Sequence, residues 1–76
     1  MSEVKQICIG AIDTYFMDAC DKAGKFLAIS VPEHLTPDDV SSEIGKCLLI
    51  DGKVIQYTEP HMIDDKWFIK AYYLRK

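Results

Sequence analysis

The sequence predicts a small, mainly β domain: an antiparallel sheet or partly open barrel of about five strands with one short helix. Three observations predict it: runs rich in β-branched and aromatic residues, an Asp-Gly pair between two apolar runs, and one segment with helix-capping signals. With 76 residues, the chain is expected to form a single globular domain, residues 1–76, around one modest core.

The first half of the chain is expected to supply three strands. Residues 4–9, VKQICI, and 26–31, FLAISV, are β-rich. Between them, one interpretation places a strand at 14–20 and a turn in which Gly24 adopts a left-handed conformation. The alternative is a second helix at 13–23, because apolar residues recur there at helical spacing, which would make the fold α+β. We favour the hairpin, since Thr, Tyr, Phe, Cys and Asp are indifferent helix formers.

Residues 37–45 carry the signals of the short helix. Thr36 is the expected N-cap, with Pro37 at the first helical position, and a glycine ends the segment. Val40 and Ile44 are spaced i, i+4 and should face inward. A helix of about two turns is not stable alone, so it should dock on the sheet.

The segment KCLLIDGKVIQY, residues 46–57, predicts a hairpin. Asp51 and Gly52 suit a two-residue type I′ turn, which needs positive φ at both central positions. Both faces of this hairpin would be apolar near the turn. We therefore expect it to lie in the middle of the structure, covered on both sides, or within a closed barrel.

The end of the chain, from residue 66, is expected to be the last strand, and Pro60 to interrupt the strand before it. Asp64 and Asp65 are interpreted as solvated loop charges. Alternation should turn one set of side chains into the core: Trp67, Ile69, Ala71 and Tyr73. The other set is the candidate partner-binding stripe: Lys66, Phe68, Lys70 and Tyr72.

The stripe has three interpretations. Exposed aromatic and charged side chains on an edge-like strand would bind a partner protein by aromatic anchors or by sheet pairing. Lysines beside aromatic faces would bind single-stranded nucleic acid, which the net charge of −3 makes the weaker hypothesis. The stripe could instead simply cover a second sheet face, with Asp51, Glu59 or Asp64 neutralising the lysines.

The sequence offers no catalytic chemistry. It has no nucleophile, phosphate-binding or zinc-protease motif, and so small a core should rarely leave room for a cavity of ~300 Å³. Cys8, Cys20 and Cys47 are expected to be free, buried thiols in a reducing compartment. His34 and His61 are expected in separate loops, away from any ligand cluster. We therefore predict no enzyme activity, no metal and no cofactor.

The expected function is a small non-enzymatic protein-binding module, an adaptor or inhibitor that docks on a larger protein. A single-stranded nucleic-acid-binding β-barrel is the alternative. The chain is expected to be cytoplasmic, without a secretory signal or membrane span, and homodimerisation follows if the final strand is a sheet edge. A further hypothesis, suggested by the small size and acidity of the chain and not by particular residues, is that a phage or mobile element encodes it and that it acts on a host protein.

Overall fold

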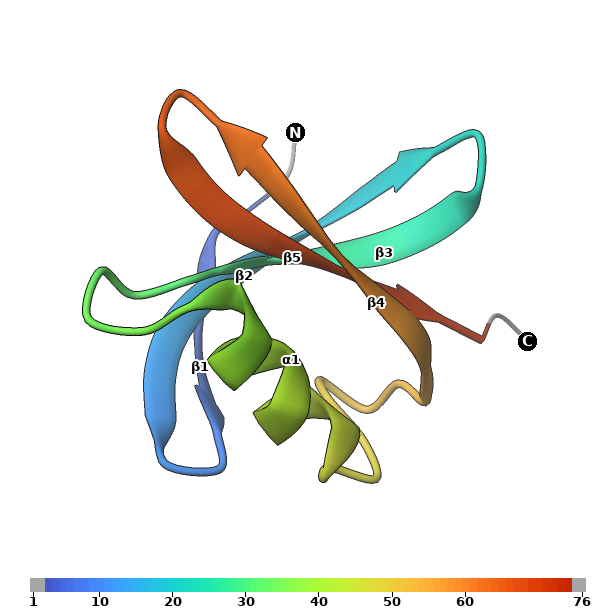
Figure 1. Cartoon of the computed structure of the whole chain (residues 1–76). Coiled ribbons are helices and arrows are strands. Elements are labelled where there is room, and N and C mark those ends of the chain that lie inside the picture. The colour runs from blue at the N-terminus through green and yellow to red at the C-terminus, as the bar shows by residue number, and fades with distance from the viewer. Residues whose placement is uncertain (1–2, 75–76) are drawn as a thin grey trace.

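An open five-stranded antiparallel sheet with one helix on one face makes up the computed structural model, which describes residues 3–74 (Figure 1). In chain order the elements are β1 (Lys5–Ile9), β2 (Ile12–Asp21), β3 (Gly24–Ser30), α1 (Pro37–Gly45), β4 (Ile55–Ile63) and β5 (Lys66–Tyr73). The mainly β prediction is confirmed. The α+β alternative is wrong, because β2 and β3 form the hairpin where the second helix was considered.

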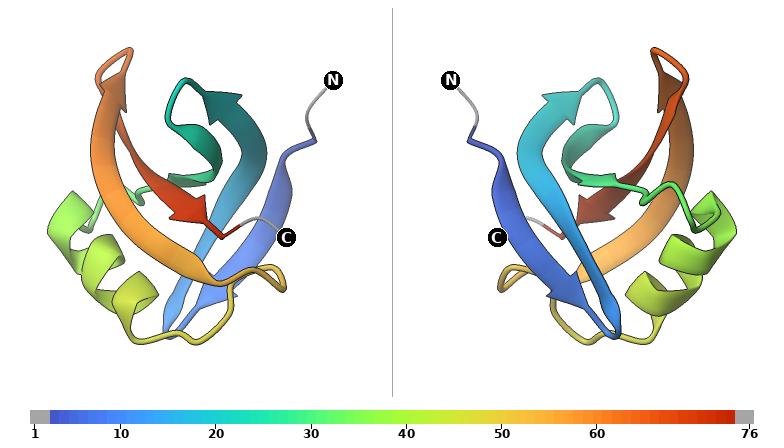
Figure 2. Two further views of the ribbon diagram at one scale, coloured as in Figure 1. Left: turned by 90° about the vertical axis from the view of Figure 1, so that its right-hand side faces the viewer. Right: turned by 90° about the vertical axis from the view of Figure 1, so that its left-hand side faces the viewer.

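The strands lie in the order β1-β2-β3-β5-β4, and every neighbouring pair is antiparallel. Figure 2 shows this sheet strongly curved, with β1 and β4 as its two outer strands. The final strand β5 is therefore central, and the expectation of an edge-like last strand is wrong. The physical reason is that the α1 crossover places β4 outside β5, so that β5 pairs with β3 on one side and β4 on the other.

Pro60 lies within β4, opposite Ile69 of β5, and does not interrupt the strand as expected. Proline cannot donate a backbone hydrogen bond, so it is tolerated where a strand has a neighbour on one side only. The edge position of β4 provides that condition, and sequence order alone could not reveal it.

Each of the three hairpin turns contains a residue with positive φ, and in the β1–β2 turn this is Gly10 with φ 62°. Gly24 has φ 133° and closes the β2–β3 hairpin opposite Asp21, as the sequence predicts. Asp64 and Asp65 have φ 51° and 65° and join β4 to β5, with Ile63 paired to Lys66. These two aspartates form a tight turn, whereas their residue types alone predicted only solvated loop charges.

Helix α1 follows its prediction. Thr36 is the N-cap: its Oγ1 accepts a hydrogen bond from the Asp39 N–H at 3.2 Å, and its own N–H donates to Asp39 Oδ2 at 3.0 Å. Val40 and Ile44 are both buried against the sheet. The remaining core residues come from β1, β2, β3, β5 and the turn after α1: Ile9, Ile12, Phe16, Leu27, Ile29, Ile50, Ile69 and Ala71.

The segment after α1 forms the predicted turn without the predicted hairpin. Asp51 and Gly52 have φ 52° and 75°, and Ile50 and Lys53 exchange two backbone hydrogen bonds of 2.9 and 3.0 Å. Residues 46 and 47 cannot continue a strand because their N–H groups donate to carbonyls of the last helical turn. The expected central position is also wrong, since Leu48 is 90% exposed.

Candidate functional site

The sheet has one face covered by α1 and an opposite face, called here the open face. Core residues Ile69 and Ala71 of β5 point toward the helix side, so their neighbours in sequence point away from it. The four residues of the predicted stripe, Lys66, Phe68, Lys70 and Tyr72, therefore all lie on the open face. Strand pairing places Ser30, Ala28 and Phe26 of β3 beside the last three of them.

The stripe differs from its prediction in exposure. Lys66 is exposed, Phe68 and Lys70 are half-buried, and Tyr72 is only 4% exposed. Trp67, expected in the core, is 40% exposed because it lies at the end of β5 next to the turn. The alternation is thus correct, but the position of each residue along the strand decides which side chains a partner can reach.

Tyr72 forms an aromatic cluster with Phe26 and Tyr57, and these two rings cover it. Its ring stacks on Tyr57 at a centroid distance of 4.6 Å and meets Phe26 at 5.3 Å. A register shift between Ile55 and Tyr57 brings Tyr57 opposite Tyr72. This end of the open face therefore has a small core of its own, which sequence reasoning missed because the shift in β4 has no local signal.

The carboxylate of Asp21 closes this cluster. Asp21 Oδ2 accepts hydrogen bonds from the Tyr72 hydroxyl at 2.7 Å and from Lys70 Nζ at 3.2 Å, while Oδ1 accepts from the Ala23 N–H at 2.9 Å. The hydrogen bond from Tyr72, followed by those from Lys70 and Ala23, lowers the pKa of Asp21. The same carboxylate raises the pKa of Tyr72 to about 12. Lys70 is thus neutralised by Asp21 rather than by Asp51, Glu59 or Asp64.

The other end of the open face carries an apolar patch, defined by Val4, Tyr15, Met17, Ala28 and Phe68. These residues and Ser30 line a hollow of about 200 Å³. Val4, Tyr15 and Met17 are exposed, with Tyr15 at 54%. Large exposed apolar patches mark interaction surfaces, which makes this patch a candidate for one.

The alternation of apolar residues along β2 is a sequence signal for part of this patch. Ile12, Thr14 and Phe16 of β2 are buried, so alternation turns Tyr15 and Met17 to the other face. Their proximity to Phe68 depends on β3 separating β2 from β5, which only the tertiary structure gives.

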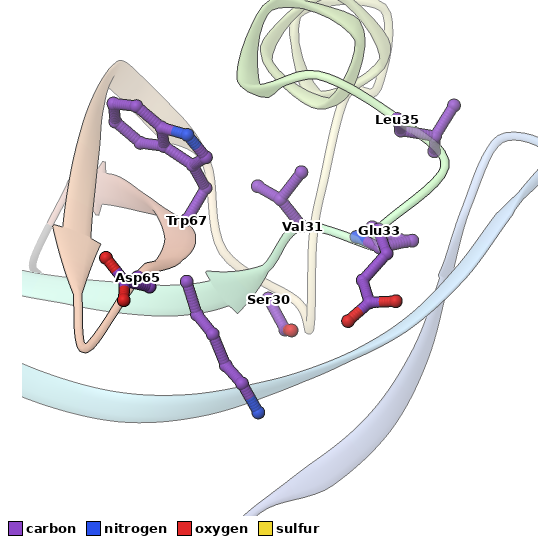
Figure 3. A pocket seen from close by; sticks show the side chains of 8 residues that line it. Ser30, Val31, Glu33, Leu35, Asp65 and Trp67 are labelled. Atoms are coloured by element: carbon purple, nitrogen blue, oxygen red, sulfur yellow. The ribbon is translucent and has the colours of Figure 1, made fainter.

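A second hollow, called here the Trp67 cleft, lies between the connection from β3 to α1 and the β4–β5 turn. It measures about 360 Å³, and its lining comes from both segments: Ser30, Val31, Pro32, Glu33, Leu35, Asp65, Lys66 and Trp67. Figure 3 shows Trp67 and Asp65 on the turn side and Leu35 and Glu33 on the connection side. This hollow leaves untested the expectation that so small a core rarely has room for a cavity of ~300 Å³, because it lies between surface segments and not within the core.

The cysteine and acidic side chains are the remaining groups with a potential for chemistry. Within residues 3–74, no group of three or more His, Cys, Asp or Glu side chains could hold a metal ion. Cys8 and Cys20 are exposed and Cys47 is half-buried, so the expectation of buried thiols is wrong for the first two. A hydrogen bond with Asp13 raises the pKa of Cys8, which disfavours the reactive thiolate.

One of the two histidines lies in a different element from the one predicted. His61 lies in strand β4, opposite Phe68, rather than in a loop, while His34 precedes α1 as predicted. In the described part of the chain, no helix is long and apolar enough to cross a membrane.

Comparison with known proteins gives no match to this chain among protein-family models, curated proteins or solved structures. Its function is therefore inferred from the chemistry of its own surfaces. Among these, the open face combines the predicted residues Lys66 and Phe68 with the exposed Tyr15 and Met17.

Proposed function

We propose that the chain is a small non-enzymatic protein-binding module, an adaptor or inhibitor that docks on a larger protein through the apolar patch of its open face. The observation that carries this proposal is the hollow lined by Val4, Tyr15, Met17 and Phe68 on a sheet face that α1 does not cover. Partner aromatics or aliphatic side chains would fill the hollow, and Lys66 would lie at its rim.

The competing function is binding of single-stranded nucleic acid through Lys66, Phe68, Lys70 and Tyr72. Such binding needs aromatic faces free to stack on bases and cations free to meet phosphates. Two of the four residues do not meet these needs. The Tyr72 ring is covered by its neighbours and cannot stack on a base, and Lys70 is paired with Asp21 and is not free to meet a phosphate. The geometry therefore favours a protein partner. A cytoplasmic location and a phage or mobile-element origin stay hypotheses.

Site-specific photocrosslinking tests the proposal. A photoreactive amino acid in place of Tyr15, with expression in the native host, should join the chain to one protein of discrete mass. The matched probe replaces Leu48, which is more exposed but lies in the segment after α1. Equal crosslinking from both positions would indicate non-specific contact and reject the open face.

A binding measurement with the recovered partner completes the test. Met17→Asp should weaken the affinity at least tenfold, since a carboxylate would be buried in the apolar hollow, whereas Leu48→Asp should leave the affinity unchanged. A gel shift with a single-stranded oligonucleotide that weakens with Lys66→Glu would support the competing function instead. Lys66 is the better variant here, because Lys70→Glu would also remove the ion pair with Asp21.

A further inference from the structure

The Trp67 cleft is a preformed feature of the fold. The Val31 N–H donates to the Trp67 carbonyl at 3.1 Å, which ties the two sides of the cleft together. The Leu35 N–H donates to the Pro32 carbonyl at 3.0 Å and closes a turn on the connection side. Little conformational entropy would therefore be lost when a ligand enters the cleft.

Trp67 is the single tryptophan of the chain and lines the cleft on the turn side, with the apolar Val31 and Leu35 on the connection side (Figure 3). It is 40% exposed, whereas Ile69, two residues further along the same face of β5, is fully buried. Within residues 3–74 the indole N–H has no hydrogen-bond partner. It is therefore free to donate to a carbonyl of a bound segment, and tryptophan is a frequent anchor residue at interfaces.

Carboxylates lie on both sides of the cleft. Glu33 lies on the connection side and Asp65 on the turn side, with Asp64 next to it (Figure 3). Among residues 3–74 these three acids have no ion pair and no side-chain hydrogen bond. Other carboxylates are already used by the fold, among them those of Asp18, Asp21, Asp39, Glu43 and Asp51. The one cation in the cleft lining is Lys66, so the cleft carries excess negative charge.

We propose that the Trp67 cleft binds an extended segment of a partner protein in which a lysine or arginine lies next to an aliphatic or aromatic residue. The apolar side chain would pack on Val31 and Leu35. The cation would lie over the indole face and pair with Glu33 or Asp65. The same carboxylates repel phosphate, which argues against nucleic acid and anionic lipid as occupants. The cleft adjoins the apolar patch of the open face, because Ser30 lines both hollows, but the two differ in all their other lining residues.

Selection from a random peptide library tests the chemistry directly. Twelve-residue peptides displayed on phage are selected on the intact chain, and the recovered sequences are compared with those recovered on Trp67→Ala. The expected result is a consensus with a basic residue beside an apolar one, enriched on the natural chain alone. An acidic or charge-free consensus, equal recovery on Trp67→Ala, or no enrichment at all would overturn the proposal.

Affinities of the selected peptide provide the second arm, with Trp67 fluorescence as the signal. The double variant Glu33→Gln, Asp65→Asn removes both charges while asparagine still accepts the left-handed backbone of the turn. It should weaken binding about tenfold, because two charge-assisted contacts are lost. Glu59→Gln, an acid of the open face, is the matched control and should change nothing.

The controls also separate this site from the proposed function. Met17→Asp should leave peptide binding unaltered, because Met17 lies outside the cleft lining. If Glu59→Gln weakened binding as much as the double variant, net charge rather than the cleft would be responsible and the proposal would fail. If the probe at Tyr15 gave no crosslink, the open face would be rejected as a docking surface, and the result for peptide binding in the Trp67 cleft would still stand.

Discussion

The hydroxyl of Tyr72 donates a hydrogen bond of 2.7 Å to Asp21 Oδ2, across 51 residues of sequence. It joins the tip of the β2–β3 hairpin to the central strand β5. Lys70 donates to the same oxygen and also lies 5.1 Å from the Phe26 ring centroid. This contact explains why half of the predicted stripe stabilises the fold and is not available to a partner.

The pH dependence of stability should report this contact. The pKa of Asp21 is lowered in the folded state, so its contribution is present above about pH 4 and is lost as the pH falls through the lowered value. The pKa of Tyr72 is raised to about 12, so its contribution is present below about pH 10 and is lost as the pH rises through about 12.

Tyr72→Phe tests both statements. The pKa of Asp21, followed by carbon-13 NMR of its carboxyl carbon, should rise toward the ordinary value because its largest stabilising hydrogen bond is removed. The urea midpoint should drop at pH 7 and become less sensitive to acid. Tyr15→Phe, which removes an exposed hydroxyl, is the control. An unchanged titration of Asp21 in Tyr72→Phe would contradict the assignment.

Asp65→Gly should stabilise the protein. Asp64 and Asp65 both have positive φ, a conformation that costs a residue with a Cβ about 1 kcal/mol more than glycine. An Asp-Gly pair is the preferred type I′ sequence. We expect a gain of about 0.5 kcal/mol in the free energy of unfolding by urea titration, after the extra backbone entropy of glycine is subtracted. Ala23→Gly, in a turn position without positive φ, should instead destabilise.

Gly10→Ala should destabilise the protein by at least about 1 kcal/mol. Gly10 has φ 62° in the β1–β2 turn, and a Cβ there would collide with Oε1 of Glu43 in α1. Adding Glu43→Ala to this variant should recover the stability lost through the collision, but not the stability lost through the backbone conformation. If the double variant, measured by the same titration, were as stable as the natural chain, alanine would adopt the left-handed conformation at position 10 without a cost.

Pro60→Thr should promote self-association. β4 is an outer strand of nine residues, and proline removes one backbone donor from it. Threonine restores the donor and favours strands, so light scattering after size exclusion should detect larger species at lower protein concentration than for the natural chain. Pro32→Ala, outside the strands, is the control. An unchanged mass for Pro60→Thr would show that this proline does not protect the edge.

The local elements were predictable where short-range chemistry decides them. Thr36, Pro37 and Asp39 specify the start of α1 through hydrogen bonds between neighbours in sequence. Asp51-Gly52 specifies a turn because few residue pairs accept positive φ twice. The alternation of β5 was correct for the same reason, since successive side chains of a strand must point to opposite faces.

The candidate site was predictable only in part. The sequence identified Lys66 and Phe68 on an outward face, and they remain there beside Tyr15 and Met17. It could not reveal that Asp21 and Tyr57 enclose Tyr72, because these residues meet through strand order and through a register shift in β4.

By itself, the sequence determined that this chain forms β hairpins, one capped helix and an alternating final strand, because those features depend on bonds and sterics within a few residues. The tertiary structure alone decided that β5 lies inside the sheet and that Trp67 stands in a cleft. It also decided that the open face has an aromatic end, where Tyr72 is buried, and an apolar end with the exposed Tyr15 and Met17. Burial depends on which distant strands are neighbours, and that arrangement is set by the packing of the whole core rather than by any local pattern.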